Sequence, residues 1–77
     1  MSETRVIDAR GHRCPVPTLR LRRALEDLPA GSRVRLIADD PMARIDVPHF
    51  AASIGAEILE LTDQPDGAIS FVVAKGP

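Results

Sequence analysis

Apolar residues along the chain recur at two different periods, and the shorter of the two predicts β-strands. Four short apolar runs, each bounded by turn-forming glycine, proline or aspartate, are typical of strands with one buried face. In the last run Ile69, Phe71 and Val73 share one side of the strand, because side chains alternate between the two faces. The predicted strands cover residues 5–9, 34–38, 57–62 and 68–74.

The longer period is that of an amphipathic helix, and it occurs twice. Residues 15–28 carry one apolar face, formed by Pro17, Leu21, Ala24, Leu25 and Leu28. Residues 47–54 carry another, formed by Val47, Phe50, Ala51 and Ile54, with Asp46 as the predicted N-cap and Gly55 at the C-terminal cap.

The order of these elements is β-α-β-α-β-β, which predicts the α/β (α+β) class. Each helix has one apolar face, and the last strand has one fully apolar face. We therefore expect a two-layer sandwich in which both helices pack on one face of a four-stranded mixed sheet. At 77 residues, the chain has room for one such domain, over residues 1–77.

Composition and cysteine count narrow the class of protein further. Hydrophobic residues make up 44% and charged residues 27% of the chain, which is typical of a globular domain. No apolar run approaches the roughly 18 residues that a membrane span needs, and the first residues do not resemble a secretory signal. We therefore expect a cytoplasmic protein that does not bind membranes. With one cysteine and two histidines, an internal disulfide and a cysteine-rich zinc site are both excluded.

Charge is unevenly distributed along the chain. Residues 1–38 hold eight arginines against four acidic residues, whereas residues 39–77 hold two basic residues against seven acidic ones. Such asymmetry predicts a basic face that meets an acidic partner, and within it Arg20 and Arg23 are candidate docking residues. The simpler alternative is a solvated helix face. Nucleic acid is a disfavoured partner, because two Phe and no Trp or Tyr offer no platform for stacking bases.

The segment from Gly11 to Pro17 contains the candidate chemistry. Pro15 suits the first position of a helix, which would make Cys14 its N-cap and point the Val16 N–H at the sulfur. The helix dipole and the neighbouring Arg13 would then stabilise a thiolate and lower the pKa of Cys14 from about 8.5 into roughly the 3.5–7.5 range. The alternative is a buried cysteine that serves only as a small apolar residue.

Two further groups near this segment are weaker candidates. His12, two residues before the cysteine, is a candidate base for the thiol or a docking residue, although a histidine in a loop is more often a solvated surface residue. Asp39 and Asp40 lie beside a proline and fit a turn and helix start better than a metal site. We therefore expect no metal and no organic cofactor.

The stretch Cys14-Pro15-Val16-Pro17, after Asp8-Ala9-Arg10-Gly11, resembles the Cys-Pro-x-Pro signature of the TusA/SirA family of small sulfur-carrier proteins. The resemblance extends along nearly the whole chain. Further family positions match in order at Gly31, Ala38-Asp39-Asp40-Pro41, Asp46-Val47-Pro48-x-Phe50 and Lys75-Gly76. The family fold is a two-layer β-α-β-α-β-β sandwich, in agreement with the pattern above.

The resemblance implies a sulfurtransferase that acts as a carrier rather than as an independent catalyst. Cys14 would receive a persulfide sulfur from a donor such as a cysteine desulfurase or a rhodanese, and pass it to an acceptor protein. Arg13 and the prolines Pro15 and Pro17 would belong to the same site. The pathways implied are tRNA thiolation, cofactor synthesis and sulfur oxidation. A thiol-based redox or regulatory module, an RNA-binding domain on the same fold and a selenium-linked variant of the chemistry remain as alternatives.

Overall fold

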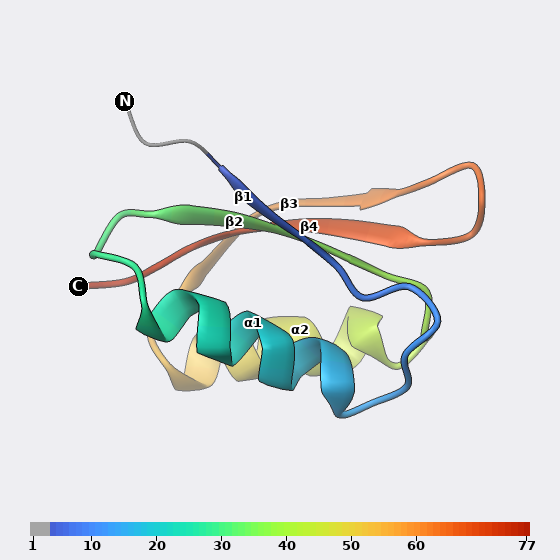
Figure 1. Cartoon of the computed structure of the whole chain (residues 1–77), viewed down its shortest axis with the longest axis horizontal. Helices are drawn as coiled ribbons and strands as arrows, with labels where there is room; N and C mark the ends of the chain where they lie inside the picture. Colours follow the sequence, from blue (N-terminus) through green and yellow to red (C-terminus); the bar gives the residue numbers. More distant parts are fainter. Residues whose placement is uncertain (1–3) are drawn as a thin grey trace.

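A computed structural model describes residues 4–77 and confirms the predicted order of elements (Figure 1). Each predicted strand and helix is present, with boundaries that differ by a few residues. The elements are β1 (Arg5–Asp8), α1 (Val16–Glu26), β2 (Arg33–Ala38), α2 (Ala43–Ser53), β3 (Glu57–Asp63) and β4 (Ile69–Ala74).

The four strands form one mixed sheet in the order β1-β2-β4-β3. β1 and β2 run parallel because α1 carries the chain back across the sheet between them, and β4 pairs antiparallel with both β2 and β3. Both helices lie on the same side of this sheet (Figure 1). The predicted two-layer sandwich is therefore confirmed.

The core lies between the helix layer and the sheet. Ile69, Phe71 and Val73 of β4 are all buried there, as their shared face predicts. The largest fully buried side chains come from α1, α2, β2 and β4: Phe71, Leu21, Leu36, Val34, Val47 and Val73. One predicted core residue is wrong, because Ile54 is the C-terminal cap of α2 and is 45% exposed.

The start of α2 differs most from the sequence prediction. The helix begins at Ala43, with Met42 as its N-cap, whereas the sequence predicted a start at residue 47 with Asp46 as the N-cap. The prediction rested on Pro48, since proline favours the first turn of a helix. Pro48 instead lies one turn further in, and Asp46 occupies the first turn. Because of this shift, the Asp46 side chain does not cap the helix and instead points toward the loop between β1 and α1.

Residues after β4 tie the end of the chain to the loop between α1 and β2. The Lys75 N–H donates to the Ser32 carbonyl at 2.8 Å, and the Lys75 carbonyl accepts from the Gly31 N–H at 2.9 Å. The Lys75 ammonium also donates to the Leu28 carbonyl, two residues after the end of α1, at 2.6 Å. Gly76 lies so close to the Gly55 carbonyl that no side chain fits at that position. Within residues 4–77, no helix has the length and apolar character needed to cross a membrane.

The position of the core predicts that replacing leucine by alanine lowers the free energy of unfolding much more at a buried position than at an exposed one. Leu36→Ala removes a fully buried side chain and should lower the free energy of unfolding by about 2–5 kcal/mol. Leu19→Ala is the matched control, because Leu19 is 54% exposed on α1 and its loss should change that free energy by less than about 0.5 kcal/mol. Urea denaturation followed by circular dichroism measures both. Equal losses in the two variants would contradict the assignment of the core.

Candidate functional site

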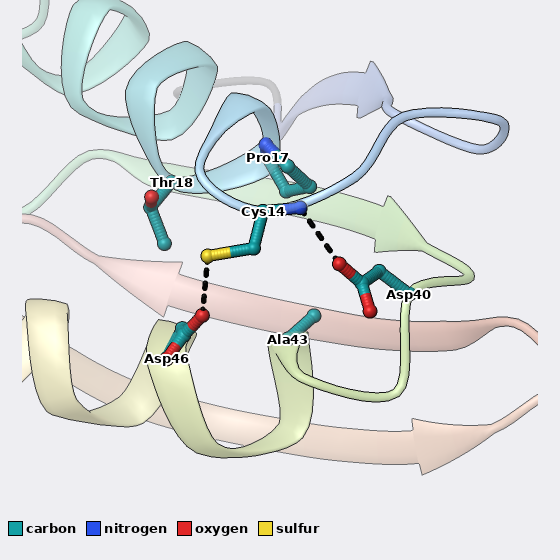
Figure 2. Close-up of a pocket in the computed structure, with 6 residues that line it drawn as sticks. All are labelled: Cys14, Pro17, Thr18, Asp40, Ala43 and Asp46. Atoms are coloured by element: carbon teal, nitrogen blue, oxygen red, sulfur yellow. Dashed lines mark hydrogen bonds between the residues drawn. The ribbon is translucent and has the colours of Figure 1, made fainter.

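Cys14 lies in the loop between β1 and α1, where the first turns of both helices meet (Figure 2). Its thiol is exposed, so the alternative of a buried structural cysteine is wrong. A narrow niche beside the sulfur is lined from the loop, from α1 and from the segment that opens α2. The lining residues are Cys14, Pro17, Thr18, Asp40, Ala43 and Asp46.

The backbone around Cys14 does not have the predicted capping geometry. Pro15, not Cys14, is the N-cap of α1, because the Pro15 carbonyl accepts the first helical hydrogen bond, from the Leu19 N–H at 3.0 Å. The Val16 N–H donates to the Arg13 carbonyl at 2.9 Å. It therefore does not point at the sulfur, and the prediction of a backbone donor to Cys14 is wrong.

The sulfur instead contacts a carboxylate. The Cys14 thiol donates a hydrogen bond to Oδ2 of Asp46 at 2.7 Å, from the first turn of α2 (Figure 2). This hydrogen bond raises the pKa of Cys14 above its ordinary value, and loss of hydration and the negative charges of Asp46 and Asp40 raise it further. The predicted lowering of the pKa is therefore wrong. The N-terminus of a helix carries only a partial positive charge, and the full negative charge of the Asp46 carboxylate has a larger effect on the pKa of Cys14.

A second carboxylate holds the backbone of the same residue. Oδ2 of Asp40 accepts the Cys14 N–H at 2.7 Å, and Oδ1 accepts the Met42 N–H at 3.1 Å. These two hydrogen bonds lower the pKa of Asp40, and the positive charge of Arg13 contributes to the shift. Only 8% of Asp40 is exposed, so the bonds are shielded from water. Asp40 thus joins the cysteine loop to the start of α2.

Asp39 anchors the other end of the loop. Both of its oxygens accept the Gly11 N–H, at 3.0 and 3.1 Å. Gly11 has a φ of 84°, a conformation that residues with side chains rarely adopt. Neighbouring Arg10 bridges Asp8 and Asp66, at 2.8 and 3.1 Å, and lowers the pKa of Asp8 to about 2. The loop is therefore held on both sides of the cysteine.

The remaining residues predicted around the cysteine have different surroundings. Pro17 is buried in the niche wall, next to the sulfur. Arg13 is exposed, and its charge acts on Asp40 rather than on the thiol. His12 is exposed, and its ring makes no hydrogen bond within residues 4–77. The structure therefore places Pro17 in the same niche as Cys14, and it shows no hydrogen bond between the His12 ring and Cys14 within residues 4–77.

The arginines of α1 occupy two settings. Arg20 donates from Nη1 to the Asp8 carbonyl at the end of β1, at 2.9 Å. Arg20 and Arg23 line one shallow groove together with Arg5 and Asp27. Arg22 pairs with Glu26 one turn along the helix, at 3.3 Å, as the four-residue spacing predicts. Arg20 and Arg23 thus border a groove that is rich in arginine, whereas His12, the other candidate docking residue, does not line it.

The sequence did not predict that Asp46 accepts a hydrogen bond from the Cys14 thiol or that Asp40 accepts one from the Cys14 N–H. Both stand in segments that the sequence marked as a turn and a helix start, and they lie 32 and 26 residues from Cys14. Within residues 4–77, no group of three or more His, Cys, Asp or Glu side chains is arranged to hold a metal ion.

Comparison with known proteins decides the family. The family model described as "Sulfurtransferase TusA" matches residues 5–75. The chain belongs to the TusA family. It is 35% identical over 72 residues to the sulfur carrier protein TusA of Pseudomonas savastanoi pv. phaseolicola, covering 94% of this chain and 84% of that one. It is 34% identical over 76 residues to the protein YrkI of Bacillus subtilis, covering 99% of this chain and 100% of that one.

The fold of this TusA family member also matches a solved structure. The SirA-like protein of Desulfitobacterium hafniense superposes with a TM-score of 0.84 at 30% sequence identity. The match covers 94% of this chain and 97% of that chain. The resemblance to the TusA/SirA family is therefore confirmed.

The hydrogen bonds of Asp40 predict a pH-dependent loss of stability. Its folded pKa lies below the ordinary value of 3.8, so its contribution is present above about pH 4 and is lost as the pH falls through the folded pKa. Asp40→Asn should lower the urea midpoint at pH 7 and flatten its decline between pH 5 and pH 2. Asp27→Asn, which removes the same charge from an exposed residue, controls for net charge. An Asp40→Asn midpoint that falls with pH as steeply as in the wild type would refute the assignment.

Proposed function

We propose that this protein is a sulfur carrier that binds one sulfur atom as a persulfide on Cys14. The observation that supports this proposal is a single exposed thiol on a loop whose backbone Asp40 and Asp39 fix on both sides. Membership of the TusA family and the name of the Pseudomonas relative, a sulfur carrier protein, point to the same role.

The proposed reaction conserves atoms and electrons without a further oxidant. The Cys14 sulfur, after losing its proton, attacks the terminal sulfur of a persulfide on the donor protein. A new sulfur–sulfur bond forms at Cys14 while the donor's sulfur–sulfur bond breaks. The donor cysteine leaves with the electron pair and takes up a proton. Delivery to the acceptor is the same exchange, with Cys14 as the leaving thiolate.

Both exchanges need a protein partner that reaches the exposed sulfur. A cysteine desulfurase or a rhodanese is the proposed donor, and the acceptor serves tRNA thiolation, cofactor synthesis or sulfur oxidation. We place these exchanges in the cytoplasm, where cysteines remain reduced. The protein then acts as a sulfurtransferase only together with its partners.

The residues beside Cys14 have positioning roles in this proposal. Pro15 caps α1, and the buried Pro17 forms part of the wall next to the sulfur, so the two prolines restrict the backbone at the cysteine. Arg13 favours the charged form of Asp40, which in turn holds the Cys14 N–H. This replaces the role of thiolate stabiliser that the sequence predicted for Arg13.

Two alternative functions fit the site less well. Redox-sensing cysteines are exposed and have a low pKa, whereas the pKa of Cys14 is raised. An RNA-binding surface of the stacking type needs exposed aromatic rings. The two aromatic residues of the chain are Phe71, which is fully buried, and Phe50, which is half-buried against the core.

Sulfur loading tests the proposal directly. Mass spectrometry after incubation with a cysteine desulfurase and cysteine should show the mass of one added sulfur atom on the wild type and none on Cys14→Ser. The variant should keep the circular dichroism spectrum and urea midpoint of the wild type, because the thiol is exposed. Loading of the serine variant to the wild-type level would overturn the assignment of Cys14.

The arginine-lined groove predicts an electrostatic contribution to docking. Arg20→Glu combined with Arg23→Glu should slow sulfur exchange with the donor protein roughly tenfold at low salt, and less at high salt, because an acidic partner surface loses its attraction. Arg22→Glu with Arg33→Glu makes the same charge change outside this groove and is the control. Equal slowing in both double variants would show that only net charge matters. Equal slowing of Cys14 alkylation by iodoacetamide would show that the arginines act on the thiol.

A further inference from the structure

The state of the Cys14 thiol in the free protein follows from its contact with Asp46. A thiol donates a hydrogen bond to a carboxylate, but a thiolate has no proton to donate. Loss of the proton would leave two negative charges at a separation of 2.7 Å, between Sγ of Cys14 and Oδ2 of Asp46. The contact therefore stabilises the thiol and opposes the thiolate, which is the form that attacks a persulfide.

The other groups around the sulfur do not offset this effect. The loop between β2 and α2 adds the negative charge of Asp40, and α1 contributes only the uncharged Pro17 and Thr18 to the niche. Arg13, the nearest cation along the chain, acts on Asp40. Within residues 4–77, Asp46 forms no ion pair and its Oδ1 accepts no hydrogen bond. Asp46 is also only half-buried, so a partner can reach it.

We propose that Asp46 keeps Cys14 protonated and unreactive in the free protein, and that a sulfur-exchange partner releases it by placing a lysine or arginine side chain against Asp46. This inference rests on the proposed carrier role of Cys14. It identifies the partner by its chemistry, because a donor persulfide is itself an anion and meets the same negative charge. A cation at Asp46 removes both obstacles at once. The Cys14 proton then leaves to water, and the departing donor thiolate takes up a proton from water.

The first test measures the thiol without any partner. The rate of alkylation by iodoacetamide, followed against pH, gives the midpoint of thiolate formation in the wild type, Asp46→Asn and Asp46→Ala. Both variants should shift the midpoint down by about one pH unit, which corresponds to roughly tenfold faster alkylation near pH 7. Glu57→Gln removes one negative charge beyond the opposite end of α2 and should leave the midpoint unchanged. A midpoint in the Asp46 variants equal to or above that of the wild type would overturn the proposal.

The second test uses the charge of the reagent in place of a partner. The ratio of the reaction rate with a trimethylammonium-ethyl methanethiosulfonate to that with the sulfonatoethyl reagent should be several-fold larger for wild-type Cys14 than for the uncharged small thiol 2-mercaptoethanol. Asp46→Asn should reduce that ratio, and Glu57→Gln should not. The ratio for the wild type requires no substitution, so it tests the proposal even if a variant is misfolded. Circular dichroism shows whether each variant is folded. A wild-type ratio equal to or below that of 2-mercaptoethanol would contradict the proposal.

These outcomes are separate from those that test the carrier role. If Cys14→Ser accepts no sulfur but Asp46→Asn leaves the thiolate midpoint unchanged, the carrier role stands and the inference about Asp46 is wrong. If Cys14→Ser is loaded like the wild type, the carrier role fails, whatever the midpoint shows.

Discussion

The Asp40 carboxylate joins two segments that lie 26 residues apart, and the geometry of the site depends on that connection. One oxygen holds the Cys14 N–H and the other holds the Met42 N–H at the start of α2. Because a largely buried carboxylate loses its water, it gains most when both oxygens have donors. The cysteine loop and the first turn of α2 are therefore fixed relative to each other, and this brings Asp46 to the sulfur.

A carrier differs from an enzyme in what its cysteine must avoid. An enzyme gains from a nucleophile that is always ionised, but a protein that travels between partners exposes its thiol to every oxidant and electrophile that it meets. The contact with Asp46 keeps the sulfur neutral between encounters. On the proposal made above, reactivity depends on the partner, and charges beside the sulfur contribute to the specificity of delivery.

Local patterns in the sequence predicted the fold because each element depends mainly on its own residues. The apolar face of α1 corresponds directly to buried side chains. In β4 the predicted face of Ile69, Phe71 and Val73 is buried, and Ser70 and Val72 on the other face are buried as well. The start of α2 was mispredicted because Pro48, a common first-turn residue, lies inside the helix, while the true start depends on the Asp40 side chain. The exposure of Cys14 was predicted correctly.

The chemistry of the site could not be predicted in the same way. The pKa of Cys14 depends on Asp46, which is 32 residues away and reaches the sulfur only after both helices have packed on the sheet. The helix dipole and Arg13 are adjacent in sequence and therefore dominated the sequence-based expectation. The contact with Asp46 across the fold is the largest cause of the raised pKa of Cys14. Local sequence thus predicted the exposed thiol, whereas the tertiary structure determines the carboxylates that surround it.

The last residues of the chain are hydrogen-bonded to the loop between α1 and β2, and this attachment affects how the domain can be fused to other proteins. The chain ends on the side of the molecule where β1 begins, opposite the first turns of α1 and α2 (Figure 1). Lys75 and Gly76 are held there by backbone contacts with Gly31, Ser32 and Gly55. A neighbouring domain, an affinity tag or a surface tether joined after Pro77 would therefore start from a fixed point far from the sulfur. The geometry suits a module that can be fused or immobilised while Cys14 still faces outward.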